Sequence, residues 1–232
     1  MIKVAILQSN YIPWKGVFDM IHHVDKFVFL DDVDFTKRDW RTRNKIKTPN
    51  GELWLTVPVR KMPRGTKINE MEILNDGKWQ KKHYSSLKGA YSKAKYFHEF
   101  EWILDEIYIN NIWCNLSEFN IHVTKLISKV LGIDTEFICS SDLSVSGSKD
   151  DRLINICKAV GADFYLSGPS AKDYIDNEKF DKSNITLNYI NYDYEEYEQL
   201  HGEFSHYVTI LDVLFHCGDK SKNYCLNFGV DK

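Results

Sequence analysis

Three polar or aromatic residues, Gln8, Asn10 and Tyr11, follow the apolar run Val4-Ala5-Ile6-Leu7. An apolar run of this length is typical of a buried strand, and open α/β sheets bind ligands where their strands end. Amide side chains both donate and accept hydrogen bonds, so they suit a nucleobase or sugar hydroxyls. A polar turn held by Pro13 is an equally good interpretation of these residues taken alone.

Two adjacent carboxylates, Asp31 and Asp32, end a second apolar run, Phe27-Val28-Phe29-Leu30. Neighbouring residues of a strand point to opposite faces, so we expect at most one of the two to face a ligand. That carboxylate could bind Mg²⁺ together with a phosphate, take a proton from an amine, or hold a ribose. A capping or turn aspartate is the structural alternative.

A cationic segment with interleaved aromatic and amide side chains comes next, at residues 37–47. If it is extended, alternate residues share one face, and arginines on that face would bind phosphate through paired hydrogen bonds. A solvated basic strand is the usual alternative, but the position after two polar strand ends favours a phosphate site, and we expect Arg43 to lie in it. The face comprises Arg41, Arg43, Lys45 and Lys47, with Trp40 and Asn44 beside them.

Two later segments also carry candidate residues. Trp79 and His83 are spaced to share a helix face, and His83 could be a general base or bind phosphate, although a lone helical histidine is more often structural. Ser167 and Gly168 follow a short apolar run, and small residues in such a strand-to-helix turn let a ligand approach the backbone. The same turn continues through Lys172 and Tyr174.

Composition narrows the class of protein. The chain has 232 residues, 43% of them hydrophobic, which is enough for one large domain with a sizeable core. A formal net charge of -3 argues against nucleic-acid binding. The five cysteines show no C-x-x-C spacing, so neither a zinc site nor a disulfide framework is indicated. No stretch reaches the ~18 apolar residues of a membrane span and the N-terminal run breaks at Gln8, so we expect a cytoplasmic protein without a membrane partner.

The elements that would position these residues alternate between strands and helices. Such alternation predicts a single α/β domain over residues 1–232, with an open, mostly parallel sheet and flanking helices. Helical periodicity dominates residues 79–131, which indicates a helical lobe in the middle of the chain. We expect strands at 3–8, 26–31, 53–59, 68–74, 136–139, 164–166 and 185–190, and helices at 14–23, 79–90, 96–108, 116–131, 150–160, near 174 and at 208–216.

Five short motifs occur in order along the chain: Leu7-Gln8-x-Asn10-Tyr11-x-Pro13-Trp14-x-Gly16, Asp31-Asp32-Val33, Trp40-x-x-Arg43-Asn44-x-Ile46-Lys47, Tyr165-Leu166-Ser167-Gly168 and Tyr197-x-Gln199. Together they resemble the WbqC-like family, nearly from end to end of the chain. Ser9 stands where that family usually has proline, and Val17 stands where an aromatic residue is usual. The first of these departures would alter the loop shape slightly.

The resemblance implies a bacterial protein of O-antigen, or lipopolysaccharide, biosynthesis that acts on nucleotide-linked amino sugars. It further implies a transferase that attaches an aminoacyl group, such as glycine, to the sugar amine. Forming an amide from a free carboxylate needs activation, most simply by ATP with Mg²⁺, and the strand-end loop is similar to that of adenylate-forming ligases by fold analogy alone. A glycosyltransferase that uses Asp31 and Asp32 to hold a metal, or a non-catalytic module that binds nucleotide sugars, is the alternative. The metal requirement and the oligomeric state stay open.

This interpretation divides the candidate residues into three roles. Asp32 or His83 would take the proton from the amine. The nucleotide and its phosphates would be bound by Arg41, Arg43, Asn44, Lys45 and Lys47. The sugar or base would be bound by Gln8, Asn10, Tyr11, Trp14, Asp31, Trp40, Ser167, Gly168, Lys172 and Tyr174.

Overall fold

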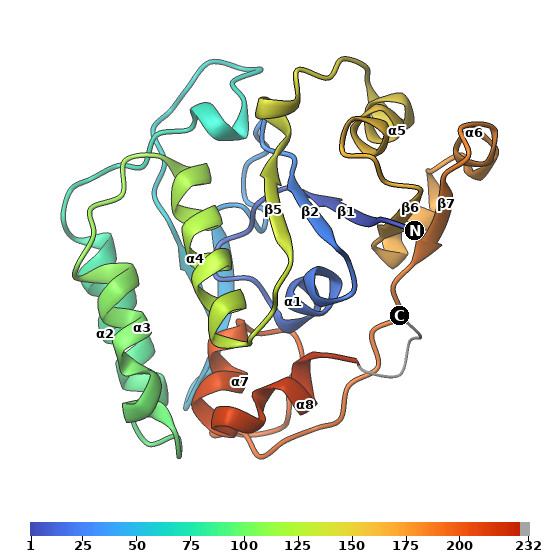
Figure 1. Ribbon diagram of the computed structural model, residues 1–232. Helices are drawn as coiled ribbons and strands as arrows, with labels where there is room; N and C mark the ends of the chain where they lie inside the picture. Colours follow the sequence, from blue (N-terminus) through green and yellow to red (C-terminus); the bar gives the residue numbers. More distant parts are fainter. Residues whose placement is uncertain (228–232) are drawn as a thin grey trace.

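The computed structural model describes residues 1–227, and its centre is a sheet of five parallel strands (Figure 1). Strand β1 lies in the middle, with β2 and then β5 on one side of it and β6 and then β7 on the other. This is the order of doubly wound α/β sheets, in which the winding reverses at the first strand. The predicted fold class is therefore confirmed. The strands span Lys3–Leu7 (β1), Lys26–Phe29 (β2), Glu136–Cys139 (β5), Phe164–Ser167 (β6) and Thr186–Tyr189 (β7).

Both faces of the sheet are buried, because successive side chains of each strand point to opposite sides. Ala5 and Phe27 belong to one hydrophobic core, whereas Val4 and Val28 belong to a second. Residues of α1 to α4 and α7 complete the first core, and residues of α5 and α6 complete the second. The helices span Lys15–His22 (α1), Trp79–Tyr91 (α2), Phe97–Tyr108 (α3), Leu116–Val130 (α4), Lys149–Ala159 (α5), Asn177–Lys182 (α6), Ile210–Cys217 (α7) and Lys222–Cys225 (α8).

The helical lobe predicted for the middle of the chain is present. Helices α2, α3 and α4 follow one another in sequence, and α2 lies beside α3 (Figure 1). Their apolar stripes enter the first core through fully buried side chains such as Leu87, Ile103 and Phe119. None of the helices in residues 1–227 combines the length and the apolar character needed to cross a bilayer.

The cationic segment forms a hairpin that is separate from the main sheet. Strand β3 (Arg43–Thr48) pairs antiparallel with β4 (Gly51–Thr56). The segment is thus extended only from Arg43 onwards, and residues 37–42 form turns. Its partner strand begins two residues before the predicted 53–59 and ends at Thr56. The turn that precedes the hairpin lies beside the loop after β1. There the Tyr11 N–H donates a hydrogen bond to the Trp40 carbonyl.

The predicted strand 68–74 is wrong. Residues Ile68–Glu70 form a 3-10 turn, and isolated bridges at Glu72 and Ile73 follow it. The backbone N–H groups of this stretch donate to several separate segments, including the carbonyls of Val33 and Cys114. A ladder needs one continuous neighbour, and this stretch has none, so its hydrogen bonds are satisfied without a strand.

Candidate functional site

A cavity of about 1320 Å³ opens at the carboxyl ends of the central strands. Gln8 follows β1, Asp32 comes after β2, and Ser167 ends β6, and all three residues line the cavity. Strand β1 is where the winding of the sheet reverses, and open α/β sheets bind ligands at this switch point. The structure therefore brings together the three strand ends that the sequence singled out.

Asp31 lies beneath the loop after β1 and does not line the cavity. Its Oδ1 accepts the Ser9 N–H at 2.8 Å, and its Oδ2 accepts from the hydroxyl of Ser117. Asp31 is only 4% exposed, and a carboxylate bonded in this way fixes the loop instead of a ligand. Asp32 is the one member of the pair that faces the cavity, as expected, although both residues lie just beyond the end of β2 at Phe29.

Tyr11 and His83 meet outside the cavity, behind the same loop. The Tyr11 hydroxyl lies 2.7 Å from His83 Nδ1 and 2.6 Å from the hydroxyl of Tyr108, and all three side chains are buried. Burial, and next the charge of Lys82, lowers the pKa of His83 to about 4, so the imidazole is neutral at pH 7. These contacts tie the helical lobe to the loop. The geometry gives no support to His83 as a proton acceptor or to Tyr11 as a sugar contact.

Asn44 supports the loop from the hairpin side. Its Nδ2 donates to the Ile12 carbonyl at 2.7 Å, and Ile12 needs this support because its φ of 32° is disfavoured for a β-branched residue. Asn44 also lines the cavity, as does Asn10. The Oδ1 of Asn10 is buried and has no hydrogen-bond partner among the described residues, so it is an acceptor available to a ligand.

Asp32 is paired with an arginine that the sequence interpretation missed. Its Oδ2 accepts from the guanidinium of Arg152 on α5, and its Oδ1 accepts from Ser140 Oγ at 2.5 Å. Arg152 also donates to the Val145 carbonyl and lines the cavity. Each carboxylate oxygen of Asp32 therefore already accepts one hydrogen bond, and one of these comes from the guanidinium of Arg152. Nothing in the spacing of residues 32 and 152 signals this contact.

Arg43 and Lys45 do not line the cavity. The Arg43 guanidinium carbon lies 4.4 Å from the centre of the Trp54 ring, and Lys45 Nζ lies 2.6 Å from Glu52 Oε2. Antiparallel pairing causes this arrangement, because it sets each cation of β3 beside aromatic and acidic side chains of β4. Trp40, which precedes the strand, does line the cavity.

Lys47 and Arg41, the last and first residues of the predicted cationic face, have different surroundings. Lys47 is 5% exposed, and its Nζ donates to Gln199 Oε1 at 3.0 Å and to the Glu203 carbonyl at 2.6 Å. Arg41 lines the cavity, with its Nε 3.4 Å from Asp39 Oδ2. Burial lowers the pKa of Arg41, and Asp39 partly opposes that shift. Arg41 is thus the cation of this face that is placed to meet a ligand.

The start of α5 supplies another part of the wall, formed by Gly147, Ser148 and Lys149, of which Lys149 is cationic. Gly147 adopts φ 117°, and an added Cβ would lie 3.1 Å from the backbone nitrogen of Arg152. Both the backbone angle and the short distance to α5 favour glycine at this position. The first N–H groups of a helix have no partner within the helix and attract anions. The sequence interpretation assigned no ligand contact to this segment.

Three aromatic side chains form one side of the cavity, which we call the aromatic wall: Trp14, Tyr192 and Tyr207. The Trp14 ring centre lies 4.9 Å from that of Tyr192, edge to face, and 6.1 Å from that of Tyr207. The Trp14 ring folds back over Gly16, where an added Cβ would lie 2.3 Å from it. Trp14 was a sequence candidate, but the two tyrosines lie in an irregular segment that no periodic pattern marks.

The turn after β6 completes the cavity. Gly168 and Tyr174 line it together with Ser167, and Tyr174 is 72% exposed. Lys172 does not line it, and its Nζ lies 5.4 Å from the centre of the Tyr189 ring. The short helix expected near 174 is a 3-10 turn at Pro169–Asp173.

A parallel sheet with this winding defines a doubly wound α/β protein, and its cavity lies at the switch point, where such proteins usually bind ligands. The chain belongs to the WbqC-like protein family, whose model matches residues 8–224. It is 42% identical over 225 residues to a protein of Mycobacterium tuberculosis (strain ATCC 25618 / H37Rv) titled "Uncharacterized protein Rv1507c", and the match covers 97% of each chain. No solved structure matches the chain significantly.

Proposed function

We propose that the protein attaches an aminoacyl group, with glycine as the first candidate, to the amine of a nucleotide-linked amino sugar, and that ATP activates the carboxylate. The chain belongs to the WbqC-like family, and this class of substrate is what the resemblance to that family implies. The observation that carries the proposal is the cavity at the switch point, where cationic, aromatic and carboxylate side chains face one space. Phosphates, planar rings and an amine that loses a proton require these three kinds of group.

The size of the cavity fits a reaction between two substrates. Sites for one drug-sized molecule measure roughly 300–1,000 Å³, whereas this cavity has about 1320 Å³. A transfer reaction has to hold donor and acceptor together, with the reacting atoms about 3 Å apart. One cavity of this size could admit both.

The cationic residues of the wall would bind the phosphates. Arg41 approaches from the turn before β3, and Lys149 and Arg152 approach from the start of α5. Within residues 1–227, no group of three or more His, Cys, Asp or Glu side chains is arranged to hold a metal ion. Mg²⁺ commonly binds through one or two carboxylates together with substrate phosphates, and Asp32 or Asp34 in the cavity would supply such a ligand.

Amide formation requires the sugar nitrogen to lose a proton as it attacks the activated carbonyl carbon. The C–N bond forms, the C–O bond to the phosphate leaving group breaks, and a carboxylate takes the proton. Asp32, Asp34 and Asp150 line the cavity. Asp32 is ion-paired with Arg152, and a substrate phosphate that draws Arg152 towards itself would open one oxygen of Asp32 to the amine, which would link proton transfer to substrate binding.

The test is to incubate the protein with ATP, Mg²⁺, glycine and a panel of dTDP- and UDP-linked amino sugars, and to follow product mass. We expect a product heavier by one glycyl residue, formed only when ATP is present. Arg41→Ala should reduce its formation. Trp102→Ala should not, because Trp102 is exposed on α3 and does not line the cavity.

The outcomes separate the alternatives. Failure to form an amide with any amino acid and any sugar in the panel would overturn the proposal. Sugar transfer without ATP would indicate a glycosyltransferase instead. The structure weakens that alternative, because Asp31 is buried against Ser9 and Ser117 and cannot share a metal with Asp32 in the cavity. Binding without turnover would indicate a non-catalytic module.

A further inference from the structure

Residues 190–209 form a long irregular segment between β7 and α7. Segments of this length without secondary structure are uncommon in compact proteins and usually functional. Two of its side chains reach the cavity, those of Tyr192 and Tyr207, which complete the aromatic wall with Trp14. The remainder of the segment makes contacts that explain how the wall is held in place.

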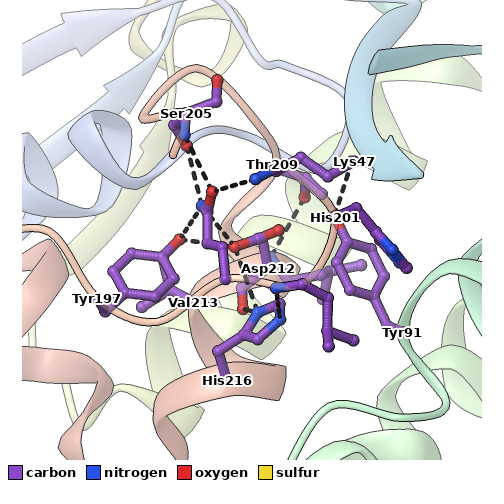
Figure 2. Close-up of polar contacts among 12 residues, drawn as sticks. Lys47, Tyr91, Tyr197, His201, Ser205, Thr209, Asp212, Val213 and His216 are labelled. Carbon is purple, nitrogen blue, oxygen red and sulfur yellow. Dashed lines mark hydrogen bonds and ion pairs between the residues drawn. The ribbon is translucent and has the colours of Figure 1, made fainter. Parts of the chain in front are cut away.

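A buried polar network holds the middle of the segment (Figure 2). Asp212 on α7 is fully buried and its Oδ1 accepts from the Tyr197 hydroxyl at 2.7 Å and from Gln199 Nε2 at 2.8 Å. Gln199 in turn accepts the Ser205 N–H at 2.9 Å and receives Lys47 Nζ at 3.0 Å. Hydrogen bonds that involve charged groups are the strong ones, so this segment has a fixed shape despite its irregular backbone.

A buried lysine holds the same segment close to the wall itself. Lys15 is 1% exposed, and its Nζ lies 4.5 Å from the centre of the Tyr194 ring and 5.8 Å from that of Phe204. The Tyr194 hydroxyl donates to Asp19 Oδ2 at 2.8 Å. Lys15 directly follows Trp14. The contacts of Lys15 and Asp19 therefore join α1 to the irregular segment close to the Trp14 ring, which lines the cavity.

The wall presents aromatic surface that the protein itself leaves uncovered. Tyr207 is 67% exposed, and its ring is tilted by 31° from that of Trp14. Large exposed aromatic side chains that line a cavity suit a flat, weakly polar partner. The cationic residues Arg41, Lys149 and Arg152 line the same cavity from other elements. A ligand with a planar ring and a phosphate chain would complement both parts of the cavity.

We propose that the aromatic wall stacks the base of a nucleoside diphosphate, with Trp14 and Tyr207 as the contact residues and Tyr192 as the residue that positions Trp14. This inference rests on the proposed function. It assigns the base of the nucleotide-linked substrate to the aromatic wall and its phosphates to the cationic residues. A planar base can lie with its whole π-face against the wall, whereas a sugar ring can offer only its C–H groups. Anchoring the wall in advance removes an ordering cost on binding.

The test compares a nucleotide with its phosphates alone. Binding of dTDP, UDP and inorganic pyrophosphate is measured by calorimetry for the wild type and for Tyr207→Ala, Tyr207→Phe and Trp102→Ala. Stacking on an aromatic side chain contributes about 1–3 kcal/mol, so Tyr207→Ala should weaken dTDP binding by about tenfold or more. Tyr207→Phe retains the ring and should bind dTDP normally. Pyrophosphate binding should be the same in all four proteins.

Several results would overturn the inference. Normal dTDP binding by Tyr207→Ala would exclude the stacking site and leave the proposed function intact. Equal weakening of dTDP and pyrophosphate would place the phosphates, not the base, at the wall. A wild type that binds none of the nucleotides would remove the inference and the proposed function together. Tyr207 is mostly exposed, so its truncation should leave the thermal midpoint unchanged, and a fall in that midpoint would show a structural role instead.

Discussion

His83 provides a sharp test of the contact between the helical lobe and the loop after β1. Its pKa is lowered from 6.5 to about 4, chiefly by burial. The unfolded chain, with the ordinary pKa, therefore binds a proton in a pH range where the folded protein does not. The stability associated with neutral His83 is complete above pH 6.5 and is lost as the pH falls towards 4. At about 1.4 kcal/mol per pKa unit, the loss amounts to about 3 kcal/mol.

Urea unfolding at pH values between 7 and 4, followed by circular dichroism, measures this loss. His83→Gln cannot take up the proton, so its free energy of unfolding should fall by about 3 kcal/mol less than that of the wild type over the same range. Protonation of carboxylates over the same pH range affects the unfolding free energy of both proteins, so it cancels when the two profiles are subtracted. Parallel pH profiles would show that His83 is protonated in the folded state, and the argument that it is a buried neutral contact would fail.

Three further predictions concern the cavity. Arg41→Ala should weaken dTDP binding about tenfold, whereas Arg43→Ala should leave it nearly unchanged, and calorimetry on the pair decides which arginine meets the phosphate. Asp32→Asn should abolish amide formation and lower the free energy of unfolding by about 2 kcal/mol, since it breaks a mostly buried ion pair; full activity would exclude it as proton acceptor. Gly16→Ala should lower the thermal midpoint and weaken dTDP binding because its Cβ displaces Trp14, although alanine is otherwise favoured in helices by about 1 kcal/mol.

The sequence predicts the fold well wherever the spacing of apolar residues matches the side chains that are buried. The strands at β1, β2 and β6 are continuous apolar runs because both sheet faces are covered. The helical lobe is recognisable because each helix buries one stripe. The failure at 68–74 has a clear cause, since apolar residues there are buried by scattered neighbours and not by a partner strand. Local composition cannot distinguish these two situations.

The candidate site could be predicted only in part. The strand ends at Gln8, Asp32 and Ser167 meet because parallel strands share one edge, which sequence reasoning can use. The partner of Asp32 could not be found in this way, because Arg152 comes from a helix far along the chain. The cationic face was misleading for a similar reason. An alternating pattern predicts a common face but does not say whether a hairpin partner, here Glu52, already neutralises it.

Several residues of the family motifs shape the cavity by holding the loop after β1 in place. Asp31 accepts a hydrogen bond from the backbone of the loop after β1, and Tyr11 connects that loop to the helical lobe. Asn44 donates to the carbonyl of Ile12, the loop residue with the disfavoured φ angle. Gln8 and Asn10, which line the cavity, lie on the same loop. Substitution of an anchor would move these amides and reduce binding, so loss of activity alone cannot identify a ligand contact here. Substitution of a contact residue that makes no ion pair within the protein, such as Tyr207, should lower affinity at constant thermal stability, whereas substitution of an anchor should lower both.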